Sequence, residues 1–335
     1  MRKIIAGILV SLSTFCFAAE EPNVFSINKM IGRGINIGAA LESPNEGDWG
    51  VTLQEEYFRL IKDAGFNSIR LPISWSTHTM DKAPYTIDAD FIKRIDWAIK
   101  NTMSRQMAVI INTHHYKPLY KDPNGHRERF VAIWRQIAEH YKDYPETLIF
   151  ELLNEPEGNL KTAEWNSILK EALAAVRQSN PQRAVIIGPA NWNDIKQLNS
   201  LELPKDDRNI IVTAHYYLPF KFTHQGAPWS HDAKSWLGTK WTGSDEEKRA
   251  IRKDFDEAAA WARKNNRPFF IGEFGTYERA DMDSRIRWTK FVSDEAINHG
   301  FSFAYWEFCY NMGLYDRETK TWRKPLLDAL IPPKP

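Results

Sequence analysis

Cysteine is almost absent from this chain of 335 residues, which carries only Cys16 and Cys309. Cys16 lies in a segment that we expect to be removed, so the mature protein could form no internal disulfide bond. A chain of about 300 residues can fold without one, because it buries about three quarters of the surface that its unfolded state exposes. Cys309 follows an apolar run, and we expect it to be a small buried hydrophobic side chain.

An excess of charge of either sign is also absent. The chain has 44 Lys and Arg against 43 Asp and Glu, a formal net charge of +1 at pH 7. Binding to nucleic acid or to an anionic lipid surface requires a basic face. The balance therefore argues against a nucleic-acid partner and against a membrane-bound mature protein.

Long apolar runs are lacking too, since residues 4–17 fall short of the ~20 that a transmembrane helix needs. Arg2 and Lys3 precede this run, and Cys16 and Ala18 supply the small residues that signal peptidase prefers before its cleavage site. We predict a signal peptide at residues 1–18, a mature domain at 19–335, and export to the periplasm or the extracellular space. A membrane anchor is the alternative.

Interdomain linkers, internal repeats and a complete glycine-rich phosphate turn are also lacking. Residues 32–34 read Gly-Arg-Gly without a third glycine, and strand-like sequence follows, which argues against a doubly wound sheet. Strand-like and helix-like segments instead alternate along the chain, and most strands are continuous apolar runs, as expected of parallel strands covered on both faces. Eight strands in about 300 residues predict an α/β fold, a single-domain (β/α)8 TIM barrel. The expected strands are 32–37, 68–72, 108–113, 147–153, 184–188, 209–215, 268–272 and 301–306, and the expected helices are 53–64, 89–103, 127–141, 163–178, 245–264 and 284–298.

Two glutamates stand directly after apolar, β-prone runs. Glu155 lies in an Asn-Glu-Pro string after the fourth expected strand, and Glu273 lies in a Gly-Glu-Phe-Gly string after the seventh. A carboxylate at such a position is costly unless it is solvated, hydrogen-bonded or catalytic. Because a barrel brings all strand carboxyl ends to one rim, we expect the two glutamates to share a site.

The other strand ends carry side chains suited to a neutral, polyhydroxylated ligand. Sugar faces stack on aromatic rings, and sugar hydroxyls need both donors and acceptors. The loop at 218–243, which follows the sixth strand and shows no helical period, adds further aromatic residues on the same rim. The candidate binding residues are Asn36, Arg70, His114, His115, Asn154, Trp192, His215, Tyr217, Trp229 and Trp306.

Several of these strings, in this order, resemble glycoside hydrolase family 5, the cellulase family, over about residues 30–330. They are Gly-Ile-Asn-Ile-Gly at 34–38, Ser-Ile-Arg-Leu-Pro at 68–72, Asn-Thr-His-His at 112–115, Asn-Glu-Pro at 154–156, His-Tyr-Tyr at 215–217, Ile-Gly-Glu-Phe-Gly at 271–275 and Tyr-Trp-Glu at 305–307. The resemblance implies a retaining β-glycosidase in which Glu155 is the acid/base and Glu273 the nucleophile. One position departs from the pattern: Ala39 stands where many members have a second asparagine, which puts a hydrogen bond to the non-reducing side of the substrate in doubt.

The chemistry of retention suggests roles for the neighbours of the two glutamates. Retention needs carboxyl groups about 5–5.5 Å apart. We expect Arg70 to hold the pKa of Glu273 down and Tyr217 to donate to the same carboxylate, while burial and the charge of Glu273 raise the pKa of Glu155. We expect Asn154 to bind the sugar 2-hydroxyl. The resemblance implies that His114 and His215 form hydrogen bonds with the carboxyls of the two glutamates or with the substrate. It also implies that His115 lies near a hydroxyl group on the glycone (non-reducing) side of the substrate.

We expect no cofactor and no metal. Adjacent strand residues point to opposite faces, so His114 and His115 are poor joint ligands. Among the tryptophans, we expect Trp192, Trp229 and Trp306 to be sugar platforms. Those inside helical runs should pack in the core. For Trp75, Trp236 and Trp241 the sequence does not decide between core packing and sugar binding. The core set is Trp97, Trp134, Trp165, Trp261 and Trp288.

The sequence thus predicts a monomeric endo-β-1,4-glucanase acting on cellulose, mixed-linkage β-glucan or lichenan. Two alternatives stay open. The first is a β-mannanase, a xyloglucanase or a dual glucanase–mannanase with the same machinery. The second is a carbohydrate-binding barrel without catalytic activity, against which the presence of both glutamates argues.

Overall fold

Eight parallel strands close into a barrel in the computed structural model, which describes residues 23–333. Each pairs with its neighbours in the sequence, and β1 pairs with β8 to complete the circle. The predicted TIM barrel and all eight predicted strands are confirmed, within a few residues at each end. The strands are β1 (Arg33–Asn36), β2 (Ser68–Leu71), β3 (Ala108–Asn112), β4 (Leu148–Glu151), β5 (Val185–Ile187), β6 (Ile210–His215), β7 (Phe269–Glu273) and β8 (Ser302–Tyr305).

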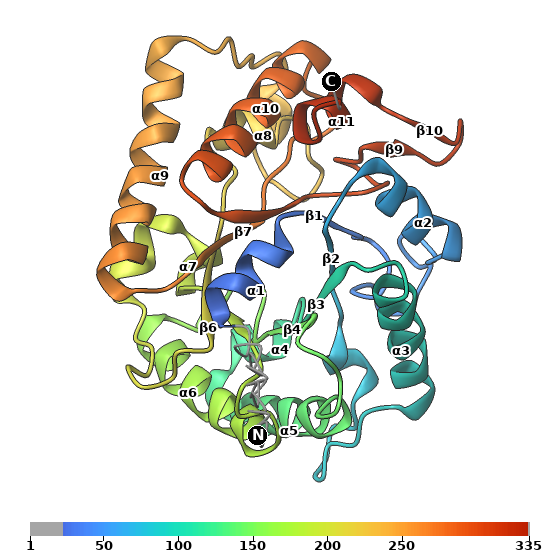
Figure 1. Cartoon of the computed structure of the whole chain (residues 1–335), viewed down its shortest axis with the longest axis vertical. Helices are drawn as coiled ribbons and strands as arrows, with labels where there is room; N and C mark the ends of the chain where they lie inside the picture. Colours follow the sequence, from blue (N-terminus) through green and yellow to red (C-terminus); the bar gives the residue numbers. More distant parts are fainter. Residues whose placement is uncertain (1–22, 334–335) are drawn as a thin grey trace, which may run out of the picture.

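A ring of helices surrounds the strands (Figure 1). The six predicted helices are present as α2 (Glu55–Ala64), α3 (Ala89–Met103), α5 (Pro123–His140), α6 (Thr162–Ser179), α9 (Asp245–Asn265) and α10 (Met282–Asn298). Helix α2 ends on Gly65 in the left-handed conformation, and Ser244 and Glu247 form a capping box at the start of α9. Strands covered by these helices outside and by barrel side chains inside are buried on both faces, which explains their continuous apolar sequences.

Helix α1 (Val24–Ile31), which the sequence did not predict, closes the amino-terminal end of the barrel. Its apolar face packs against side chains in the barrel interior, among them Ile110 and Phe270. Asn28 donates to the carbonyl of Phe269 at 3.1 Å and accepts from the Ser302 hydroxyl at 2.7 Å, at the first residues of β7 and β8. The barrel is thereby sealed at one end, and its site must lie at the other.

The remaining short helices and strands lie in the connections that follow the carboxyl ends of the barrel strands. The loop at 218–243 contains two short helical turns, α8 (Phe220–Thr223) and η3 (Ala233–Trp236), where no helical period was expected. The other short elements are η1 (Trp75–His78), α4 (Lys117–Lys121), α7 (Ala190–Asn193), η2 (Ile195–Ser200), β9 (Tyr315–Asp316), β10 (Thr321–Trp322) and α11 (Lys324–Leu330).

The five tryptophans assigned to the core are buried or packed against it, and Trp75 and Trp241 join them. Cys309 is buried as a free thiol, as predicted. Within the described part of the chain, no helix is both long and apolar enough to span a bilayer. The predicted signal peptide at 1–18 lies outside the described residues.

Candidate active site

A cavity of about 940 Å³ opens at the carboxyl end of the barrel. Its lining comes from the carboxyl ends of the strands or the loops that follow them, at every strand except β2. Glu155 and Glu273 both line it, together with the aromatic side chains of Trp192, Trp229 and Trp306. The cavity is therefore where the sequence placed the site.

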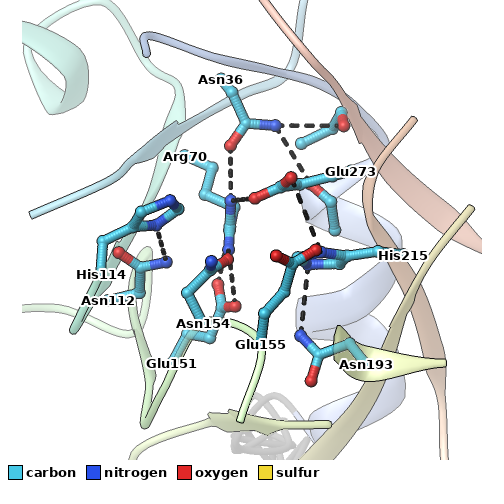
Figure 2. Close-up of polar contacts among 12 residues, drawn as sticks. Asn36, Arg70, Asn112, His114, Glu151, Asn154, Glu155, Asn193, His215 and Glu273 are labelled. Carbon is cyan, nitrogen blue, oxygen red and sulfur yellow. Dashed lines mark hydrogen bonds and ion pairs between the residues drawn. The ribbon is translucent and has the colours of Figure 1, made fainter. Parts of the chain in front are cut away.

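Arg70, on β2, lies beneath the cavity floor and is fully buried. Its guanidinium has five N–H donors, and each of them has an acceptor. Nε and Nη2 bind both oxygens of Glu151, at 2.6 and 2.8 Å. Nη1 donates to Asn36 and Glu273, and Nη2 also donates to Asn154, all at 2.8 Å. Figure 2 shows this guanidinium between the side chains that it holds in place.

The two glutamates face each other across a short gap. Glu273 is the last residue of β7, and Glu155 follows β4 in a turn where its own φ is +46°. One carboxylate oxygen of each residue, together with a ring nitrogen of His215, lies within 4.8 Å of the others. Separations near 5–5.5 Å are typical of retaining glycosidases, whereas inverting enzymes need about 6.5–9.5 Å for an intervening water. The geometry here belongs to the first class.

The surroundings of the two carboxyls differ in how far they favour the charged form. Burial raises the pKa of Glu155 to about 8, against the opposing pull of Arg70. Burial also raises the pKa of Glu273, and His215 and Arg70 oppose this rise. Arg70 lowers the pKa of Glu273, as expected, but loss of solvent outweighs the guanidinium and the net shift is upward. The bonds that Glu273 accepts from Arg70 and Tyr217 still favour its charged form over that of Glu155.

Three predicted neighbours contact the carboxyls or Arg70. The Tyr217 hydroxyl donates to Glu273 Oε2 at 2.9 Å. His215 Nδ1 lies 2.6 Å from Glu155 Oε1 and 3.6 Å from Glu273 Oε2. Asn154 accepts from Arg70 through Oδ1, and its amide N–H₂ group remains for a ligand in the cavity that it lines.

His114 and His115 lie closer together than strand alternation predicted. Strand β3 ends at Asn112, and His115 has φ +53°, so the chain has already turned out of the strand. Both rings line the cavity, with centroids 4.4 Å apart. His114 contacts the Asn112 amide at 3.1 Å and stacks on Trp306, and no described hydrogen bond joins it to either catalytic-site glutamate.

Asn36 does not reach the cavity, which corrects its assignment as a substrate-binding residue. Its side chain is fully buried, accepts from Arg70 and donates to the carbonyl oxygens of Gly272 and Ala304. With these bonds made, it has no group left for a sugar. Its role in the structure is to hold Arg70 between β1 and β7.

The walls of the cavity carry aromatic rings at different depths. Trp192 and Trp229 are 52% and 55% exposed, and both project from loops at the rim. Trp306 lies deeper, with its ring nearly parallel to that of His114. Trp49 also lines the cavity and is 37% exposed. The sequence reasoning missed Trp49, although its place in the long segment after β1 was a usable signal.

Glu151 and Asn193 are the other important residues that the sequence reasoning missed. Glu151 lies within a predicted strand, and a carboxylate inside an apolar strand needs a cation, which is the signal that could have identified it. Asn193 follows Trp192 and contacts His215 at 3.3 Å. No sequence pattern distinguishes it from the surrounding polar residues.

A metal ion would find one set of three potential ligands in residues 23–333, formed by Glu155, His215 and Glu273. Three of the four carboxylate oxygens and both ring nitrogens of His215 are already paired in hydrogen bonds. Arg70, whose Nη1 lies 2.8 Å from Glu273, adds a positive charge that repels a cation. The arrangement suits proton transfer better than metal binding.

Comparison with known proteins identifies the family. Residues 31–312 match the model of cellulase, glycosyl hydrolase family 5. This chain belongs to that family. It is 38% identical over 315 residues to Endoglucanase H of Acetivibrio thermocellus. The aligned region covers 92% of this chain but only 34% of the relative. The chain thus spans about a third of that longer protein.

Solved structures of the family superpose closely on this one. The endoglucanase Cel5A of Thermotoga maritima has a TM-score of 0.91 and 52% sequence identity, covering 92% of this chain and all of its own. A cellulose synthase subunit Z of Clostridioides difficile has a TM-score of 0.87 and 40% identity, over 90% of this chain and 99% of its own. Membership of family 5, inferred from the motifs, is therefore confirmed.

Replacing Glu151 by Gln should destabilise the fold by about 3–5 kcal/mol, because it leaves the buried Arg70 charge without its bidentate partner. Urea unfolding followed by tryptophan fluorescence would measure the loss. Glu171→Gln is the matched control, since it removes an equally short but exposed pair with Arg127 and should cost about 1 kcal/mol or less. Equal costs for the two variants would contradict the structural importance of the buried pair.

Proposed function

We propose that this protein is a retaining endo-β-1,4-glucanase in which Glu273 is the nucleophile and Glu155 the acid/base. The observation that carries the proposal is the pair of carboxyls within 4.8 Å, with different surroundings. Glu273 accepts hydrogen bonds from Arg70 and Tyr217, as an anionic nucleophile requires. Glu155 faces the cavity with its pKa raised to about 8, as an acid requires.

In the first step, a Glu273 oxygen attacks the anomeric carbon and forms a glycosyl ester. Glu155 gives its proton to the glycosidic oxygen as the carbon–oxygen bond breaks, and the aglycone leaves as an alcohol. In the second step, Glu155 accepts a proton from water, and the water oxygen attacks the same carbon. The ester bond to Glu273 breaks, both carboxyls return to their starting forms, and two inversions give net retention.

Other cavity residues fit the binding of a polysaccharide. The free amide N–H₂ of Asn154 is placed to bind the 2-hydroxyl of the sugar that reacts, beside the carboxyls that act on it. Trp306 provides a deep stacking face, and the exposed rings of Trp192 and Trp229 provide faces further out. Platforms at the rim support binding of several sugars of a long chain, which is what an endo-acting enzyme needs.

A dual glucanase–mannanase is the second candidate, and the relatives favour it. Cel5A of Thermotoga maritima, 52% identical to this chain, has been crystallised with cellobiose and with a mannotriose substrate. A more distant neighbour from Clostridium acetobutylicum, 26% identical with a TM-score of 0.82, is described as a broad-specificity endoglucanase. We therefore propose β-1,4-glucans as the main substrates and mannans as accepted ones.

Hydrolysis of carboxymethylcellulose, lichenan, glucomannan and xyloglucan, measured side by side as released reducing ends, tests this function. We expect cleavage of the first three, and a loss of about 10⁴-fold or more in Glu273→Ala, as when other enzymes lose their nucleophile. Cleavage of glucomannan or xyloglucan alone, with carboxymethylcellulose and lichenan left intact, would refute the glucanase proposal. Wild-type protein that binds these polymers but cuts none would indicate the non-catalytic barrel.

Glu155→Gln should separate the acid role from simple binding. We expect a loss of about 10²–10⁴-fold on carboxymethylcellulose, the usual value of a general acid. An aryl cellobioside with a dinitrophenyl leaving group needs no proton, so its initial burst of released phenol should be largely kept. Stopped-flow absorbance measures the burst.

The matched control is Glu171→Gln, which makes the same change on the exposed surface of α6, outside the cavity lining and away from Glu155. This variant should keep the wild-type preference between polymer and aryl substrate. Equal losses on both substrates in Glu155→Gln would contradict the acid role.

A further inference from the structure

Three consecutive residues after β5 have left-handed backbone conformations. Asn191, Trp192 and Asn193 have φ of 63°, 58° and 53°. This conformation costs about 1–2 kcal/mol for a residue with a Cβ, less for asparagine, and occurs mostly at single positions. The surrounding structure must therefore hold the segment, and strained segments of this kind gather at functional sites. Its consequence is that Trp192 lines the cavity while Asn193 is fully buried.

Two glycines make room for the buried Asn193 side chain and for His215. A Cβ on Gly188 would lie 2.3 Å from Asn193 Oδ1, and a Cβ on Gly272 would lie 3.0 Å from His215 Nε2. The Asn193 amide nitrogen lies 3.3 Å from that same ring nitrogen (Figure 2). Asn193 Oδ1 has no hydrogen-bond partner among the described residues. The pocket is thus shaped to bring this amide against the far side of the His215 ring.

The contact decides which nitrogen of His215 carries the proton. Burial lowers the pKa of His215 to about 4, so the ring is neutral near pH 7 and has a single N–H. An amide N–H that donates to Nε2 requires a lone pair there, which leaves the proton on Nδ1. Nδ1 is the atom that lies 2.6 Å from Glu155 Oε1.

We propose that Asn193 is a positioning residue that keeps His215 in its Nδ1–H form, so that the acid proton of Glu155 stays on Oε2. The inference rests on the proposed acid role of Glu155. With Nδ1–H donating to Oε1, the Glu155 proton finds no acceptor in His215 and remains available to the glycosidic oxygen. With the proton on Nε2 instead, Nδ1 would accept the Glu155 proton and hold it away from the substrate.

The same tautomer serves the second step of the reaction. Once Glu155 has given up its proton it is an anion, and Nδ1–H still donates to it. In the other tautomer two lone pairs would face each other across 2.6 Å, which would destabilise the anion. One fixed tautomer therefore supports Glu155 both as an acid and as a base, without any rotation of the ring.

Asn193→Asp tests the proposal, because it keeps the shape and the tolerance of positive φ but replaces the donor by an acceptor. Nitrogen-15 NMR of histidine-labelled enzyme without substrate reports directly which ring nitrogen of His215 is protonated. We expect Nδ1–H with a bare Nε2 in the wild type, and a protonated Nε2 in Asn193→Asp. Asn193→Gly, which also suits this backbone, removes the amide and should give a mixture of tautomers. A wild-type ring protonated on Nε2 would overturn the proposal.

Kinetics provide the second readout. In Asn193→Asp, kcat on carboxymethylcellulose should fall about tenfold to a hundredfold, with the burst on the dinitrophenyl cellobioside less affected and KM nearly unchanged. Asn266→Asp is the matched control, since Asn266 is an exposed asparagine with φ +48° at the end of α9. It should change neither the rates nor the His215 signals.

The outcomes separate this inference from the proposed function. A wild-type enzyme that cuts no glucan or mannan refutes the function, whatever its tautomer. In the second case, the wild type is active, and the Asn193 variants change the tautomer of His215 but not the preference between polymer and aryl substrate. That result refutes the role of Asn193 and leaves the proposed function standing. Equal losses on both substrates in Asn193→Asp would also refute it, as they would indicate general damage to the site.

Discussion

The buried guanidinium of Arg70 is the interaction on which the site depends. A charge taken out of water costs several kcal/mol unless other groups compensate for it, and here four side chains from β1, β4, β7 and the turn after β4 do so. Each of these bonds also fixes its acceptor. The position of Glu273, of Asn154 and of the strand end that precedes Glu155 therefore follows from satisfying one cation.

The charges around Arg70 add to the effect of burial on the two carboxyls of the site. Arg70 balances one negative charge, while Glu151 and Glu273 together supply two, and His215 is neutral near pH 7. Burial raises the pKa of Glu155 to about 8, and the charge of Glu151 adds to the rise, so a proton on Glu155 is favoured near pH 7. When Glu273 becomes an ester in the proposed cycle, its charge is lost, and Glu155 can ionise and act as a base.

The sequence predicted the barrel and the shared location of Glu155 and Glu273, because both depend on local patterns that a single chain displays. Continuous apolar runs identify strands buried on both faces, and the carboxyl ends of such strands meet at one rim, so Glu155 and Glu273 could be paired before any distance was known. Trp192, Trp229 and Trp306 were found in the same way, from their places in strand-end loops. The cavity contains all five.

What the sequence could not predict depends on contacts between distant strands. Asn36 ends an expected strand, as other candidate binding residues do, but its side chain turns inward to Arg70, Gly272 and Ala304. His115 leaves the strand alternation because its backbone turns to φ +53°. Helix α1 was missed because its partners, the interior side chains at the amino end of the barrel, come from other parts of the sequence.

The stereochemistry of the product tests the central claim most directly, since it reports whether the two carboxyls act across a gap too narrow for an intervening water. Proton NMR during the first minutes of cello-oligosaccharide hydrolysis would resolve the new reducing end before the anomers equilibrate. The account predicts that the β-anomer appears first and the α-anomer only later. Initial formation of the α-anomer would contradict it.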